Sequence, residues 1–331
     1  MRAAREPRRE PRREPIGRPM PHPRRFRFGL KVRSAESGAA LAELARRAES
    51  LGYASLLLSD HPTHPQLAPI ATAAALACAT TRVRIGASVL ANDFRHPVLL
   101  AKEIAALDRL SGGRAELGIG TGWKREEYES LGIPFERAGL RIERLAEALQ
   151  ILRSCLAGKR FDFEGRHYRV QGLSCEPPPV QARLPILVGG GGRKLLSLAA
   201  READIVGINP AVRSGAHDAA TDADATAAAT DEKLAWVREA AGARYAELEL
   251  SMQVYVACVS EDRAQADRAA QARYAFPIEQ VREVPYVWAG SVGEICDALE
   301  ARRERWHASY WIVPDGCMES LAPIVARLAG R

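Results

Sequence analysis

The chain has 331 residues, with 47 Lys and Arg against 41 Asp and Glu, so its formal net charge is +6. Nine Arg and three Glu within residues 1–25 account for this whole excess, and the charges of the remaining chain balance. That balance argues against a nucleic-acid partner for the main part of the protein. Apolar residues make up 47% of the chain, enough for a full core. The most apolar run, residues 68–80, is too short to span a membrane.

Residues 1–25 form a basic Arg/Pro/Glu segment with a near repeat of Arg-Glu-Pro-Arg and almost nothing to bury. Its composition predicts a disordered tail, and Met20 is an alternative candidate for the native start. Six cysteines are widely spaced without a C-x-x-C pair, which predicts reduced thiols in a cytoplasmic protein and no metal site.

From Phe26 onward, short apolar runs alternate with segments of helical periodicity. The predicted strands are 26–32, 55–58, 83–90, 115–119, 185–188, 205–208, 248–258 and 309–313. The predicted helices are 39–51, 67–78, 98–110, 126–131, 140–156, 194–201, 231–241 and 261–273. Eight strands that alternate with helices predict an α/β fold, a single (β/α)8 TIM barrel over residues 26–331.

Two stretches interrupt the alternation and predict insertions into the barrel. Residues 158–185 place aromatic and apolar residues near every second position before a run of three prolines, which predicts a hairpin. Residues 211–230 are mostly Ala, Asp, Thr and Ser without apolar periodicity, which predicts a mobile loop and a candidate lid.

The first candidate site residues follow the second strand, where Asp60 and His61 stand with His64 close behind. Active sites of such barrels lie at the carboxyl ends of the strands. An Asp-His pair there can place a titratable imidazole near neutral pH, with the carboxylate orienting the ring. The alternative is a loop histidine bonded to the backbone.

The fifth strand is followed by four glycines, 189–192, then Arg193 and Lys194 at the start of a helix. Glycine amides and a helix N-terminus favour a bound phosphate, so Gly190, Gly191, Gly192 and Arg193 are candidate phosphate contacts. The alternative is a flexible turn.

The fourth strand ends in Gly118-Ile-Gly120-Thr-Gly122-Trp123. Small residues such as Gly120 would leave room for a flat ring, and Trp123 would stack on that ring or on a substrate. Trp123 as part of the core is the alternative. Glu126 and Glu127 are expected to occupy only the first turn of the next helix, where carboxylates are favoured.

These motifs together resemble the bacterial luciferase-like flavin and deazaflavin oxidoreductases. The resemblance covers about residues 26–315 and rests on Ser59-Asp60-His61, Ser88-Val89-Leu90, Asp108 to Arg114, Gly118 to Trp123 and Leu187 to Gly192. Within this superfamily the chain looks closest to the branch that uses the deazaflavin coenzyme F420, with the glucose-6-phosphate dehydrogenase and the methylenetetrahydromethanopterin reductase.

The resemblance implies roles for several of these residues. Asp60 and His61 would face the deazaflavin, with the histidine beside the carbon that exchanges hydride. Ser88 and Val89 would form a bulge with a non-prolyl cis peptide behind the ring, and Gly191 and Gly192 would bind the coenzyme phosphate. Relatives often dimerise, so a homodimer is an expectation.

One departure from the branch concerns Trp123, which stands where the sugar-phosphate dehydrogenase has an acidic residue. The resemblance then implies that this acid is missing and that a less polar small molecule is the substrate. The expected function is hydride transfer between F420 and an activated C=C, C=N or C=O bond, with His61 or bulk water delivering the proton. The alternatives are a flavin mononucleotide (FMN) monooxygenase that uses reduced flavin and oxygen, and a non-catalytic flavin-binding barrel.

Overall fold

A computed structural model describes residues 24–33 and 35–331, so nearly all of the predicted basic tail lies outside the described residues. Its strands are β1 (Arg27–Val32), β2 (Ser55–Leu58), β3 (Arg84–Ala87), β4 (Leu90–Ala91), β5 (Ala115–Gly120), β6 (Phe161–Glu164), β7 (Arg169–Leu173), β8 (Ile186–Gly190), β9 (Ile205–Ile208), β10 (Glu249–Gln253), β11 (Val256–Val259), β12 (Val287–Gly290) and β13 (Ala308–Pro314). Its α-helices are α1 (Gly38–Ser50), α2 (Pro69–Ala79), α3 (Pro97–Leu110), α4 (Arg125–Ser130), α5 (Ala138–Leu156), α6 (Arg193–Glu202), α7 (Ala219–Ala223), α8 (Ala227–Ala241), α9 (Arg263–Gln271), α10 (Ile278–Glu283), α11 (Val292–Trp306) and α12 (Met318–Leu328).

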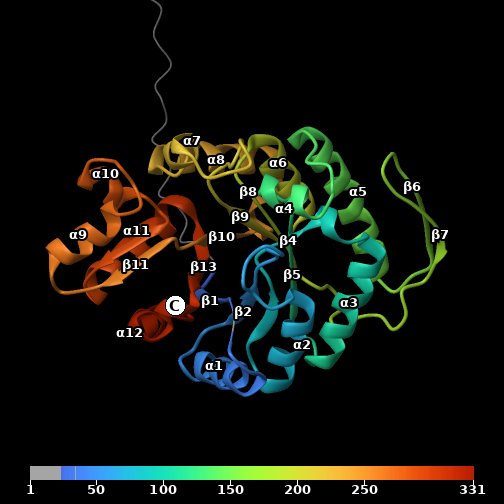
Figure 1. The fold of residues 1–331 in the computed structure, drawn as a ribbon, viewed down its shortest axis with the longest axis horizontal. Coiled ribbons are helices and arrows are strands. Elements are labelled where there is room, and N and C mark those ends of the chain that lie inside the picture. The colour runs from blue at the N-terminus through green and yellow to red at the C-terminus, as the bar shows by residue number, and fades with distance from the viewer. Residues whose placement is uncertain (1–23, 34) are drawn as a thin grey trace, which may run out of the picture.

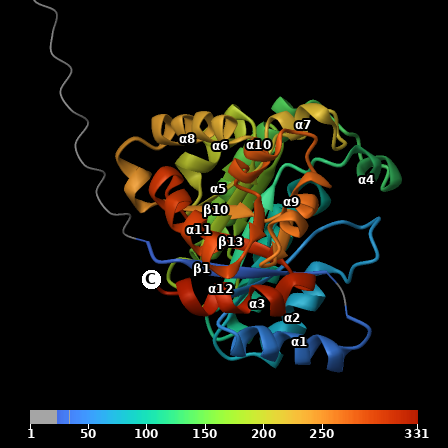
Figure 2. The same ribbon diagram turned by 90° about the vertical axis from the view of Figure 1, so that its left-hand side faces the viewer.

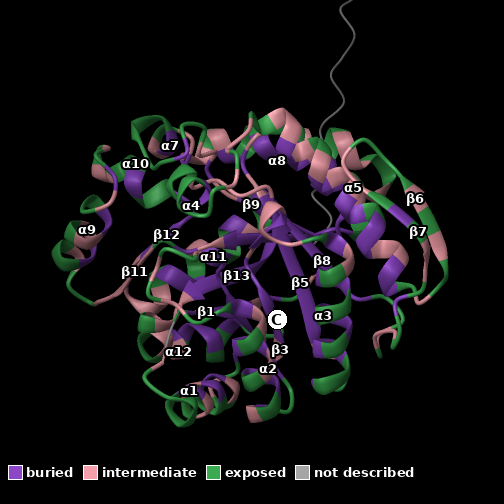
Figure 3. Cartoon of the chain, turned by 45° about the vertical axis from the view of Figure 1, so that its right-hand side comes forward, coloured by how far each residue is buried: buried purple, intermediate pink, exposed green. Residues whose placement is uncertain are grey.

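Eight parallel strands close into the predicted barrel (Figure 1). β1 pairs with β2 on one side and β13 on the other, and the order continues through β10, β9, β8 and β5 to β3. A β3–β5 pairing completes the ring. The strands are buried and the outer faces of the helices are exposed (Figure 3).

The barrel has an apolar interior of its own, separate from the larger core between strands and helices. This interior cluster consists of Leu57, Leu187, Ile205, Tyr310 and Ile312, with Val89 packed against it. It fills the middle of the barrel, so a ligand can enter only above it, at the carboxyl ends of the strands.

Below that cluster, a charged network fills the amino-terminal end of the barrel. The Arg27 guanidinium donates to both Glu116, at 3.0 Å, and Glu249, at 2.7 Å. The Tyr310 hydroxyl donates to Glu116 at 3.0 Å and bonds Ser55 Oγ at 2.6 Å. Each buried charge therefore has an ionic partner, which burial of a charge requires.

The predicted third strand, 83–90, is interrupted. Ala87 ends β3 and Leu90 begins β4, and the peptide bond between Ser88 and Val89, which separate the two strands, is cis. The predicted seventh strand, 248–258, is also two strands. β10 belongs to the barrel, whereas β11 pairs with β12 outside it.

The insertion 158–185 is confirmed as the antiparallel hairpin β6–β7, which lies outside α5 in Figure 1. The loop prediction for 211–230 is wrong in part, because it contains α7 and the first turn of α8. Asp218 and Thr226 cap these two helices. Figure 2 shows α4 and α7 at the end of the barrel toward which β1 runs.

The segment 274–306, for which no element was predicted, holds α10, β12 and α11. With β11 and α9 it forms a lobe on the opposite side from the hairpin in Figure 1. A capping box of Ser291 and Glu294 opens α11, and this Ser-x-x-Glu spacing was the available signal. In the described part of the chain, no helix has the length and apolarity that crossing a membrane demands.

Candidate functional site at the mouth of the barrel

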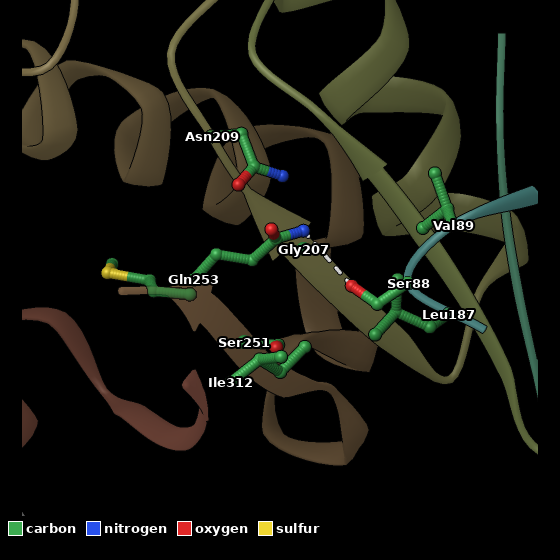
Figure 4. A pocket seen from close by; sticks show the side chains of 9 residues that line it. Ser88, Val89, Leu187, Gly207, Asn209, Ser251, Gln253 and Ile312 are labelled. Atoms are coloured by element: carbon green, nitrogen blue, oxygen red, sulfur yellow. Dashed lines mark hydrogen bonds between the residues drawn. The ribbon is translucent and has the colours of Figure 1, made fainter. Parts of the chain in front are cut away.

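A cavity opens above the apolar interior, between β3, β8, β9, β10 and β13 (Figure 4). Its lining comprises Ser88, Val89, Leu187, Gly207, Asn209, Ser251, Met252, Gln253 and Ile312. The side chains of Leu187 and Ile312 give it an apolar base, and Ser88, Asn209 and Gln253 give it hydrogen-bonding groups. The lining therefore combines an apolar base with polar groups near the carboxyl ends of the strands.

The expected cis peptide between Ser88 and Val89 is present. Val89 packs against the glycines of neighbouring strands, since a Cβ on Gly120 would lie 2.9 Å from Val89 Cγ2. Val89 therefore fills the space beside Gly120. The expectation that Gly120 itself leaves room for a ring is wrong. Gly120 instead allows Val89 to lie at the cavity wall.

His61 is held by Glu127, not by Asp60 as expected. His61 Nδ1 lies 2.9 Å from Glu127 Oε1, and Thr63 Oγ1 donates to the same oxygen at 3.2 Å. Glu127 is only 3% exposed, so this first-turn residue of α4 points inward. The acid expected to be missing at the position of Trp123 is indeed replaced by that tryptophan, but Glu127 brings another carboxylate to the site from four positions further along.

Asp60 instead joins the end of β2 to the segment after the bulge. Its Oδ2 accepts from the Ala91 amide at 3.0 Å, and Arg95 binds both carboxylate oxygens, at 2.5 and 3.1 Å. Two parallel bonds from a guanidinium fix the position of a carboxylate strongly. Asp60 thereby positions the bulge that carries Ser88 and Val89.

The imidazole of His61 is neutral at physiological pH. Burial, together with the positive charges of Lys31 and Lys124, lowers the pKa of His61 to about 4 against the opposing effect of Asp60. Burial also raises the pKa of Glu127, while Lys124 and Thr63 act in the opposite direction. With Nδ1 donating to Glu127, Nε2 is left as a hydrogen-bond acceptor.

Trp123 lies beside the imidazole and is half-buried, so it is not a core residue. Its ring meets His61 edge-on at 5.9 Å between centroids and meets His217 at 5.0 Å. His217 belongs to the insertion 211–230, which also contacts α4 through the Gly215 carbonyl and the Arg125 amide. The insertion thus forms one wall of the site.

His61, His64 and Glu127 offer ligand atoms within 4.8 Å of one another, a set that could hold a metal ion. The Lys124 ammonium already lies 3.0 Å from His64 Nε2 and 3.8 Å from Glu127. A metal ion would have to displace this cation, so the arrangement favours a hydrogen-bonded cluster.

The glycine loop lies at the same end of the barrel. A Cβ on Gly191 would lie 2.4 Å from the Asn209 carbonyl oxygen, whereas a Cβ on Gly192 would meet nothing within 4 Å. Gly191 is therefore required for packing, and Gly192, the N-cap of α6, faces open space. Arg193 does not reach into the loop, because its exposed side chain binds Glu239 of α8 at 2.9 Å.

Lys31 and Gln253 were missed by the sequence analysis. Lys31 Nζ donates to Gln253 Oε1 at 3.1 Å. Gln253 Nε2 donates in turn to Ser88 Oγ at 3.0 Å (Figure 4). Both residues stand at the carboxyl ends of barrel strands, β1 and β10. Their polar character at those positions was the signal that could have found them.

Comparison with known proteins agrees with this geometry. The sequence profile of the luciferase-like monooxygenase family matches residues 24–326. A protein of Nakamurella multipartita named F420-dependent glucose-6-phosphate dehydrogenase is 31% identical over 306 residues, which are 88% of this chain and 84% of the relative. A relative of the same name from Microbacterium testaceum is 37% identical over 54% of this chain.

Other matches cover less of the relatives. The chain spans 61% of the length of an uncharacterised Mycobacterium tuberculosis protein at 34% identity, and 55% of the Microbacterium protein. Among these relatives, the Nakamurella protein is the one matched over most of its own length.

Solved structures share the fold. An F420-dependent tetrahydromethanopterin reductase from Methanopyrus kandleri superposes with a TM-score of 0.73 at 16% identity, over 92% of this chain and all of that one. The monooxygenase RslO1 from Streptomyces bottropensis gives 0.69 at 21% identity, over 92% and 97%. With the sequence match over almost the whole described chain, the protein belongs to the luciferase-like monooxygenase family.

Proposed function

We propose that this protein is an F420-dependent oxidoreductase that transfers hydride between the deazaflavin and an activated C=C, C=N or C=O bond of a small organic molecule. The observation that carries the proposal is the 31% identity with an F420-dependent glucose-6-phosphate dehydrogenase over 88% of the chain. Two relatives with this name match, which favours F420 over FMN.

The residues at the mouth suit such a coenzyme. Ser88 and Val89 line the cavity where a ring would lie, with Trp123 and His61 beside it. Gly192 and the N-terminus of α6 would hold the phosphate, because the loop is open there and a helix leaves its first amides without partners. A bound reduced deazaflavin supplies the hydride.

His61 would act as an orienting group. Its Nε2 is an acceptor that can bind an N–H or O–H of the coenzyme or of the substrate, and Glu127 fixes the ring through Nδ1. Glu127, which is buried, also places a negative charge near the substrate, whereas Lys31 and Lys124 contribute positive charges to the same region. This mixed polarity accommodates a carbonyl, imine or conjugated acceptor better than a saturated hydrocarbon.

Titration of the purified protein with F420 and with FMN tests the proposal. We expect saturable binding of F420, followed by its fluorescence, and at least tenfold weaker binding of FMN. Tight FMN binding with rapid oxygen consumption by the reduced complex would favour the monooxygenase instead. Binding of neither would contradict both functions.

A further inference from the structure

A chain of three hydrogen-bonded side chains crosses the mouth of the barrel. It begins at Lys31 on β1, passes through Gln253 at the end of β10 and ends at Ser88 in the bulge after β3. Arg27, four residues before Lys31, bonds Glu116 and Glu249 inside the barrel, and Lys31 bonds a β10 residue in the same way. The side chain of Lys31 is therefore an interior group of the barrel, at the level of the cavity.

The ammonium decides the direction of this chain. An ammonium can only donate, so the Gln253 amide must present its oxygen to Lys31 and its NH2 to Ser88. Ser88 Oγ then accepts, and its own O–H remains available to a ligand in the cavity that Ser88 and Gln253 both line. Lys31 thereby determines which hydrogen-bonding groups the cavity offers.

Lys31 carries a charge that the described residues do not neutralise with an ion pair. Near the end of β1, the Asp315 carboxylate is bound by Arg33, whose amide and Nε lie 2.9 and 3.1 Å from it. On β2, Asp60 is held by Arg95. Burial, with the nearby charge of Arg33, lowers the pKa of Lys31 to about 8.

His61 and Lys124 are the neighbouring candidates for a proton donor at the mouth. The imidazole of His61 is already neutral there, and its pKa of about 4 leaves almost no imidazolium. Lys124 is engaged with His64, Glu126 and Glu127. A group acts best as a general acid when its pKa lies near the working pH, a condition that Lys31 meets.

We propose that Lys31, and not His61, is the proton donor of this site, an inference that rests on the proposed F420-dependent function. The carbon of the acceptor bond takes the electron pair and hydrogen from the reduced deazaflavin. The second atom of that bond takes a proton from Lys31 Nζ. The amine that remains recovers a proton from solvent, and Gln253 holds it in place. Acceptors whose second atom becomes basic on reduction, such as ketones, imines and enones, form the substrate class.

Lysine NMR gives a direct test, because the chain contains only six lysines. Protein labelled with carbon-13 at lysine Cε is titrated from about pH 6 to 11, with and without oxidised F420, and Lys31→Arg identifies the signal. We expect Lys31 to titrate near pH 8 and its signal to shift on F420 addition, whereas the signal of Lys159, which is exposed, should not respond to F420. A Lys31 signal that titrates above about pH 10, or that ignores bound F420, overturns the proposal.

A kinetic arm uses reduced F420 and cyclohexenone as the probe acceptor. In the unmodified protein the rate should fall tenfold per pH unit above about pH 8, as the ammonium is lost. Lys31→Arg and Lys31→Met should lower the rate about 100-fold or more and abolish this decline above pH 8. His61→Asn should retain the decline of the rate above pH 8. Lys159→Arg should match the unmodified protein in rate and in pH dependence.

The outcomes separate the two proposals. Absence of F420 binding by the unmodified protein contradicts the proposed function itself. If the Lys31→Arg protein binds F420, reacts at the full rate and keeps the decline above pH 8, only the role of Lys31 is contradicted. Thermal unfolding and F420 affinity of each variant show whether a lost rate reflects lost folding. If the probe is not reduced, the NMR titration alone decides the proposal.

Discussion

At the scale of single residues, the lowered pKa of His61 makes the stability of the protein depend on pH. Its native pKa of about 4 lies below the ordinary value of 6.5, so the unfolded state binds the proton more readily. Stability should therefore fall as the pH drops below about 6.5 and level off below about 4. Between pH 7.5 and 5, we expect the unfolding free energy of the His61→Asn protein to fall by about 1–2 kcal/mol less than that of the unmodified protein.

Urea denaturation at the two pH values measures this difference. Lowered pKa values of His64 and His307 add to the acid sensitivity of both proteins, so only the difference between them reports on His61. Equal losses in both proteins would show that folding does not lower the pKa of His61.

Gly192 offers a clean test of the phosphate loop. Gly192→Asp adds a carboxylate in open space, beside amides that would bind phosphate, so F420 affinity should fall at least tenfold. Gly192→Ala, which adds only a methyl group, should bind within about threefold of the unmodified protein. Isothermal titration with F420 measures both, and equal affinity of Asp and Ala variants would discard the phosphate role. Gly191 is unsuitable, because any Cβ there meets the Asn209 carbonyl.

At the scale of elements, the bulge after β3 and the end of β5 depend on each other. A methyl group at Gly120 would lie 2.9 Å from Val89 Cγ2 and 3.3 Å from the Gly189 carbonyl oxygen. Gly120→Ala should cost about 1–3 kcal/mol of unfolding free energy and displace Val89 from the cavity wall. F420 affinity should fall with it.

Gly38→Ala is the matched control, since a Cβ there has nothing within 4 Å and the residue begins α1. Denaturation curves should show it to be neutral or slightly stabilising. A Gly120→Ala protein as stable as this control, with full F420 affinity, would contradict the coupling between the two strands.

Two strands show where sequence patterns were sufficient to predict the bounds of an element. The strands 55–58 and 205–208 agree with β2 and β9 residue for residue, because uninterrupted apolar runs have one way to be buried in a parallel sheet. The same criterion predicts a single strand over 83–90, yet the structure has two strands there, β3 and β4, on either side of the cis peptide. No local pattern of Ser and Val specifies that geometry.

At the scale of the whole molecule, the two ends of the barrel have separate tasks. The ionic network of Arg27, Glu116 and Glu249 closes the amino-terminal end, and the ligand cavity opens at the other. Glu116 is 1% exposed and also accepts from Tyr310. Removing one partner of such a buried set leaves an unpaired charge.

Glu116→Ala should therefore lower the unfolding free energy by about 3–5 kcal/mol. The exposed pair of Arg47 and Glu319 gives the control, and Glu319→Ala should leave the unfolding free energy nearly unchanged. Denaturant unfolding measures both, and F420 affinity of the folded Glu116→Ala protein should be unchanged. Similar costs for the two substitutions would contradict a stabilising role for the network.

The amino-terminal segment carries the whole net charge, although the family match begins at residue 24. Removing residues 1–19 should leave the melting temperature and the F420 affinity unchanged, because the family match begins only after them. Calorimetry and fluorescence titration check this, and a large loss in either would show that the segment belongs to the functional unit.

The sequence by itself determined the barrel, the hairpin insertion and the end of the barrel at which function lies. Burial of apolar runs with a fixed alternation is a local property, and a parallel barrel orients all strand ends alike. Only the tertiary structure decided which side chains meet at the mouth. Lys31, Gln253 and Ser88 are separated by up to 222 positions, and Glu127 reaches His61 across 66. Contacts over such separations depend on closure of the whole barrel, which leaves no trace in local periodicity.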